Sequence, residues 1–100
     1  MFVHVVNFWL KKSLKKEEIS FFENEVSLLA KIKTIVHFNV GAPANTDRPV
    51  IDRSYNYCLL TTFNDEAGHD FYQVAPEHLE FIKNCAHLWD KVLIYDSESM

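Results

Sequence analysis

Cysteine, glycine and proline are scarce in this sequence, at two, two and three of its 100 residues. Two cysteines without a CxxC pair are too few for a disulfide scaffold, so we expect a reducing and hence cytoplasmic compartment. The only glycines, Gly41 and Gly68, are far apart, which excludes a glycine-rich loop that cradles phosphate. We therefore expect no cofactor.

Long apolar runs and an excess of positive charge are also missing. No stretch approaches the ~18 consecutive apolar residues of a membrane span, and no signal peptide is evident, so we expect no membrane partner. The formal net charge of −4 argues against a nucleic-acid partner, which would need a basic face. With 48% hydrophobic and 24% charged residues, the chain is typical of one folded domain.

The apolar pattern predicts four strands. Segments rich in β-branched and aromatic residues, bounded by polar or turn residues, occupy 2–10, 34–40, 55–63 and 91–95. Residues 41–54 form a long loop, which the sequence leaves open as a lid or a dimer contact. We place the domain at residues 1–96, followed by a polar tail over 97–100.

Segments with the apolar periodicity of a helix lie between these strands. Apolar residues recur every three or four positions over 15–31, which predicts an amphipathic helix with Ser13 as a candidate N-cap. Residues 64–65 offer a cap for a short helix to about Gln73, and a second helical piece covers 76–89. The order of elements predicts an α+β, ferredoxin-like βαββαβ fold with a four-stranded antiparallel sheet.

Alternation along each strand separates an apolar face from a mixed one. We assign the apolar face to the helices, because right-handed crossovers place both on one side of the sheet. The other face would expose roughly 350 Å² of flat surface, near the limit for a monomer. The alternative to pairing is a monomer that tolerates this face. We predict a homodimer through Val3, Val5, Trp9, Leu60, Leu93 and Tyr95.

Four segments in order resemble the stress-responsive A/B barrel domain family. They are VHVVNFWLK near the start, SYNYCLLTTF at 54–63, YQVAPEHLEF at 72–81 and KVLIYD at 91–96. The resemblance covers residues 1 to about 96 and implies a dimeric α+β barrel. This agrees with the homodimer that we predict from the strand faces.

The resemblance also implies site residues. A plant polyketide cyclase of this family implies a catalytic pair at Tyr72 and His78 and a pocket residue at His4. Ala75 stands where the family motif has its first histidine. The pocket tyrosine and a further pocket histidine fall on Glu25 and Tyr57, so this sequence keeps the pair and changes the pocket around it.

These side chains suit proton transfer. A neutral His78 can take a proton from an acidic carbon or hydroxyl, and the Tyr72 hydroxyl can donate to a carbonyl oxygen. His4 would polarise a second oxygen. Alternatively, all three are packed core residues, and His78 only hydrogen-bonds a backbone carbonyl at the helix break. The apolar wall of a small-molecule pocket would come from Phe22, Leu59, Phe81 and Trp89, which are equally suited to the core.

No set of side chains has convincing metal-ligand spacing, so we expect no metal. We interpret His69 and Asp70 as a solvated helix face, and His87 and Asp90 lack the further ligands of a zinc site. Two function classes remain. The first is a small homodimeric protein that binds a mostly apolar ligand between helices and sheet. The second is a cofactor-free acid–base enzyme, such as a cyclase, isomerase or monooxygenase, that uses Tyr72 and His78.

Overall fold

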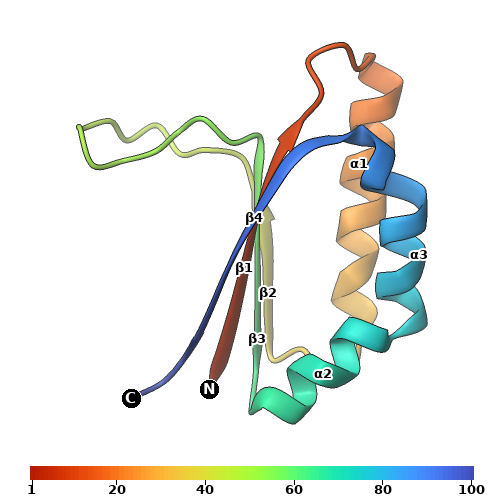
Figure 1. Cartoon of the computed structure of the whole chain (residues 1–100), viewed down its shortest axis with the longest axis vertical. Coiled ribbons are helices and arrows are strands. Elements are labelled where there is room, and N and C mark those ends of the chain that lie inside the picture. The colour runs from red at the N-terminus through yellow and green to blue at the C-terminus, as the bar shows by residue number, and fades with distance from the viewer.

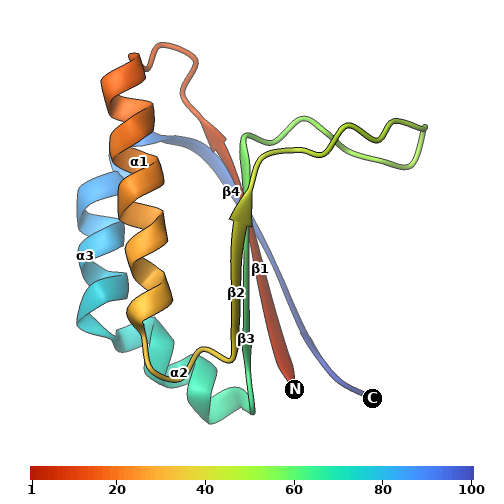
Figure 2. The ribbon, with the colours of Figure 1, turned by 180° about the vertical axis from the view of Figure 1, so that it is seen from behind.

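The computed structural model describes all 100 residues and confirms the ferredoxin-like α+β fold. Four antiparallel strands form one sheet in the order β2-β3-β1-β4, and the helices cover one of its faces (Figures 1 and 2). None of the helices is both long enough and apolar enough to span a lipid bilayer. The elements are β1 (Phe2–Leu10), α1 (Lys16–Leu28), η1 (Leu29–Lys31), β2 (His37–Gly41), β3 (Tyr57–Phe63), α2 (Glu66–Val74), α3 (Pro76–Cys85), η2 (Ala86–Leu88) and β4 (Trp89–Glu98).

Local sequence explains the break between α2 and α3. The Asp65 carboxylate accepts a hydrogen bond from the Gly68 N–H at 2.9 Å, which caps α2. Ala75 is extended because the proline that follows it disfavours helical backbone, and Pro76 then opens α3. At α1 the predicted cap is wrong. The N-cap is Lys15 rather than Ser13, and its N–H donates to the Glu18 carboxylate at 2.9 Å.

Three strands have boundaries that differ from the prediction, and β4 begins at Trp89, which the prediction placed in the second helical piece. β2 begins at His37 rather than 34, because residues before it form a turn in which the Ile35 N–H donates to the Ile32 carbonyl. β3 begins at Tyr57 rather than 55. β4 runs on to Glu98, because β1 offers it a pairing partner along its whole length. Two of the four residues of the predicted polar tail, Ser97 and Glu98, are therefore strand.

The two faces of the sheet have the predicted characters. Residues of β1 alternate between buried and half-buried, and the buried set includes His4, Val6 and Phe8 beneath the helices. No helix covers the opposite face (Figures 1 and 2), and Tyr95 there is 61% exposed. The loop between β2 and β3 projects from the sheet on that same uncovered side. The other predicted dimer residues, Val3, Val5, Trp9, Leu60 and Leu93, are half-buried.

Candidate functional site

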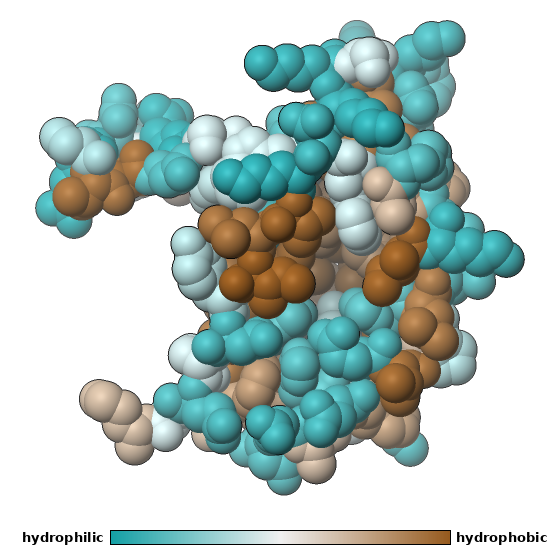
Figure 3. Space-filling model, viewed as in Figure 1, coloured by the Kyte–Doolittle hydropathy of each residue, from teal (hydrophilic) through white to brown (hydrophobic).

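A cavity of about 160 Å³ lies between the sheet and helices α2 and α3. We call it the histidine cavity. Figure 3 shows apolar side chains around a hollow between the sheet and the helices, and the lining residues Ile82 and Ile94 are themselves partly exposed. Its lining includes all but one of the predicted site residues, namely His4, Leu59, Tyr72, His78, Phe81 and Trp89.

His4 is held by a partner from the far end of the chain. It lies opposite Asp96 in the β1–β4 pair, and its Nδ1 is 2.5 Å from the Asp96 Oδ1. Burial lowers the pKa of His4, while the Asp96 hydrogen bond and charge raise it in part. A neutral imidazole that donates Nδ1–H to a carboxylate keeps its lone pair on Nε2. His4 therefore brings a hydrogen-bond acceptor to the cavity.

The His78 ring is also held through a hydrogen bond at its Nδ1. Its Nδ1 donates to the Gln73 carbonyl at 3.1 Å, across the break between α2 and α3. Burial is the main cause that lowers the pKa of His78. The predicted structural contact is thus present. It also leaves the Nε2 of this cavity-lining side chain as an acceptor, so the structural and ligand-binding interpretations are compatible.

Tyr72 stands between the two histidines. Its ring centroid is 5.7 Å from that of His4 and 4.6 Å from that of His78, and only 1% of the residue is exposed. Burial alone raises the pKa of Tyr72, with no contribution from a charged or hydrogen-bonded neighbour. The phenol therefore stays protonated near neutral pH, and its hydroxyl is free to donate to a ligand.

The prediction of a solvated His69 is wrong. Its ring stacks on Phe2 at 4.4 Å between centroids and lies 4.8 Å from the ring of His4, while Gln73 contacts its Nε2 at 3.0 Å. His69 and Tyr72 are three positions apart on α2, so one helix face carries both toward β1. That spacing could have predicted from the sequence that His69 lies beside Tyr72. The contact of Asp96 with His4 could not be predicted in this way, because the sequence pattern does not give the register of β1 against β4.

His4, His69 and Asp96 bring one ligand-type atom each within 4.8 Å of the others. Two atoms bound tetrahedrally to one zinc ion at ~2.0–2.1 Å would stand about 3.3 Å apart. The 2.5 Å between His4 and Asp96 is shorter, and it is the separation of two atoms that share a proton. The arrangement is therefore that of a hydrogen-bonded pair with a neighbouring imidazole.

The structure does not bring Phe22 to the histidine cavity. Its side chain is fully buried and packs edge-on against Phe8, with Tyr57 and Phe81 as further ring neighbours. It fills the core beside the cavity instead of lining it. Trp89 does line the cavity, and its Nε1–H is buried without a hydrogen-bond partner.

A helix-covered antiparallel sheet with a cavity between the two layers defines the class: a ferredoxin-like α+β protein with an interior site. Residues 2–99 match the stress responsive A/B barrel domain family, and the chain belongs to that family. This confirms the resemblance seen in the sequence. None of the curated proteins matches the chain.

Solved structures share the fold over nearly the whole chain. A Dabb family protein from Mesorhizobium loti is 25% identical, with a TM-score of 0.79 over 99% of this chain and 96% of that one. A dimeric ferredoxin-like protein of unknown function from Bacteroides fragilis is 25% identical, with a TM-score of 0.76 over 98% and 95%. A hydroxynitrile lyase from Passiflora edulis is 20% identical, with a TM-score of 0.78 over 96% and 90%.

Proposed function

We propose that the chain binds a small, mostly apolar carbonyl compound in the histidine cavity. The observation that carries this proposal is Tyr72, a buried residue of the cavity lining whose hydroxyl has no hydrogen-bond partner in the protein and whose ring lies beside two imidazoles. A cavity of ~150 Å³ lined by apolar side chains is known to hold benzene. The 160 Å³ here therefore suits a ligand of about one ring.

Acetophenone is a matched probe for this proposal, because it combines one ring with one carbonyl. Its isostere α-methylstyrene replaces the oxygen by CH₂. We expect acetophenone to shift the backbone amide NMR signals of Leu59 and Phe81 saturably. Tyr72→Phe should weaken its binding about 5–10-fold, the effect of one neutral hydrogen bond, and leave α-methylstyrene unaffected.

Tyr55→Phe is the control, because it removes a phenolic hydroxyl outside the histidine cavity. Equal acetophenone affinity in wild type and Tyr72→Phe would overturn the proposal. A large fall in melting temperature without a change in binding would instead support a purely structural role for Tyr72.

A second candidate function is acid–base chemistry on the bound compound, and the His4–Asp96 pair favours it. A carboxylate on Nδ1 orients an imidazole and stabilises the imidazolium that forms when Nε2 takes a proton. Tyr72 would donate to the oxygen on which negative charge develops. A hydroxynitrile lyase of the same fold is consistent with small-molecule chemistry on this architecture.

Deuterium exchange separates catalysis from binding alone. In D₂O, a base in the cavity would remove a methyl proton of bound acetophenone and return deuterium, so the methyl NMR signal would fade. We expect His4→Ala and His78→Ala to slow this exchange. Saturable binding without any protein-dependent exchange would leave the binding function and reject the enzymatic one.

The uncovered face of the sheet supports a homodimer. It carries half-buried apolar side chains with no helix over them, and a solved relative that is 25% identical is dimeric. We propose that two copies pair sheet to sheet through Val3, Val5, Trp9, Leu60, Leu93 and Tyr95. The histidine cavity, on the opposite face, would remain within each copy.

A further inference from the structure

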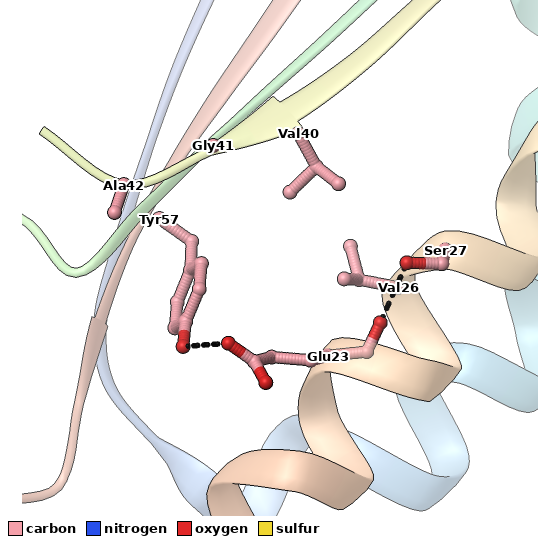
Figure 4. A pocket seen from close by; sticks show the side chains of 7 residues that line it. All are labelled: Glu23, Val26, Ser27, Val40, Gly41, Ala42 and Tyr57. Atoms are coloured by element: carbon pink, nitrogen blue, oxygen red, sulfur yellow. Dashed lines mark hydrogen bonds between the residues drawn. The ribbon is translucent and has the colours of Figure 1, made fainter. Parts of the chain in front are cut away.

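A second cavity, of about 300 Å³, lies between α1 and the adjoining ends of β2 and β3. We call it the Glu23 cavity. It shares no lining residue with the histidine cavity. Figure 4 shows Val26 of α1 and Val40 of β2 directed into the same space, with the Tyr57 ring along one side and the Glu23 carboxylate at one end.

The polar end of this cavity is built around one carboxylate. The Tyr57 hydroxyl donates to the Glu23 Oε2 at 2.6 Å, and this contact occupies one of the two carboxylate oxygens (Figure 4). Burial, followed by the Glu23 hydrogen bond and charge, raises the pKa of Tyr57 to about 12. The phenol therefore remains a donor and keeps this carboxylate oriented at neutral pH.

Glu23 has no cationic partner within the chain. No lysine, arginine or histidine nitrogen lies within 4.0 Å of its carboxylate. The Ser27 hydroxyl, which also lines the cavity, already donates a hydrogen bond to the Glu23 backbone carbonyl at 2.7 Å. Glu23 is exposed, so the second oxygen of this oriented carboxylate faces solvent at the edge of a cavity whose walls are otherwise largely apolar, and a ligand can reach it.

A ligand that matches these features carries a compact positive charge on a short apolar body. An ammonium group supplies the N–H donors that the second carboxylate oxygen can accept, and a charge-assisted pair is stronger than a neutral one. The Tyr57 ring, beside the carboxylate, offers a π-face to the same cation. The valine side chains would take up a branched alkyl tail. A neutral ligand would lack the charge-assisted contact with the carboxylate, and an anionic ligand would be repelled by it.

We propose that the Glu23 cavity is a binding site for a small aliphatic primary amine. The ammonium group lies on Glu23 against Tyr57, and the alkyl tail lies between Val26 and Val40. This site goes beyond the carbonyl-binding function proposed above and is independent of it, because the two cavities are lined by different residues.

The test uses isoamylamine, with isoamyl alcohol as its neutral counterpart and 4-methylpentanoate as its anionic one. Binding is followed through the backbone amide NMR signals of Val40 and Gly41 in the intact protein. We expect saturable shifts with the amine and at least ~10-fold weaker binding of the alcohol and the anion. Glu23→Gln keeps the shape of the side chain and removes its charge. We expect it to weaken the binding of the amine by a similar factor.

Tyr57→Phe should weaken amine binding by a smaller factor, because it removes the hydroxyl that orients the carboxylate and keeps the ring. Glu17→Gln is the control, because it makes the same charge change at an exposed position at the start of α1. Equal amine affinity in wild type and Glu23→Gln would overturn the proposal. Amide shifts that are not saturable, or that spread over the acidic surface, would also overturn it.

Discussion

His4 and Asp96 lie 92 positions apart in the chain, and their side chains share a 2.5 Å hydrogen bond across the β1–β4 pair. The contact joins the first and last strands and fixes the tautomer of a buried imidazole. It also connects the fold to the candidate chemistry, because the nitrogen left unprotonated belongs to a side chain that lines the histidine cavity.

Loss of the Asp96 carboxylate should destabilise the fold. Asp96→Ala leaves the buried Nδ1–H of His4 without its acceptor, which we expect to cost about 1–2 kcal/mol in the free energy of unfolding. Asp96→Asn retains an acceptor oxygen and should cost less. Urea unfolding measures both, with Asp90→Ala as an exposed control on the same strand. Equal stability of wild type and Asp96→Ala would show that the contact contributes nothing.

Stability should fall on mild acidification. Burial lowers the pKa of His4 and His78 below the ordinary 6.5, so between their folded pKa and 6.5 the unfolded chain binds more protons. Their contribution to the free energy of unfolding is complete above pH 6.5. It is lost as the pH falls from 6.5 through the pKa of the folded state. Each histidine adds at most ~1.4 kcal/mol per pH unit to this slope.

The pH dependence is measured by urea unfolding between neutral and mildly acidic pH. His78→Asn keeps a donor near the Gln73 carbonyl and cannot titrate, so it should flatten the slope. A stability that rises as pH falls would contradict the assignment of neutral, buried imidazoles.

Phe22 should behave as a core residue and not as a ligand contact. Its side chain is fully buried, so Phe22→Ala should cost about 3–5 kcal/mol in unfolding free energy. Its neighbour Phe21 is 43% exposed, and Phe21→Ala should cost far less. Thermal or urea unfolding compares the two. A small loss of unfolding free energy in Phe22→Ala, together with a loss of acetophenone binding, would instead show that Phe22 lines the ligand pocket, as the sequence predicted.

The uncovered sheet face should hold two copies together. Val5 and Leu60 are cross-strand partners on this face, so a lysine at Val5 would place a charge within the apolar interface. We expect Val5→Lys to give the mass of one chain by light scattering, where wild type gives two. Val74→Lys, at an exposed position of α2, is the control. A one-chain mass for wild type would reject the dimer.

The sequence predicted the features that depend on local pattern. Alternation along residues 2–10 assigned the buried face of β1, and Pro76 marked the break between the two helices. The burial of His69 was missed, because the orientation of α2 on the sheet is set by packing. The role of Asp96 and the length of β4 were missed as well. Both follow from strand register, which is a long-range property.

We propose above all that the Tyr72 hydroxyl donates a hydrogen bond to a ligand oxygen in the histidine cavity. The infrared stretch of the carbonyl-¹³C-labelled acetophenone bound to the protein measures that bond directly, because hydrogen-bond donation lowers its frequency. We predict a lower frequency for the wild-type complex than for the Tyr72→Phe complex. The same frequency in both complexes would contradict the claim.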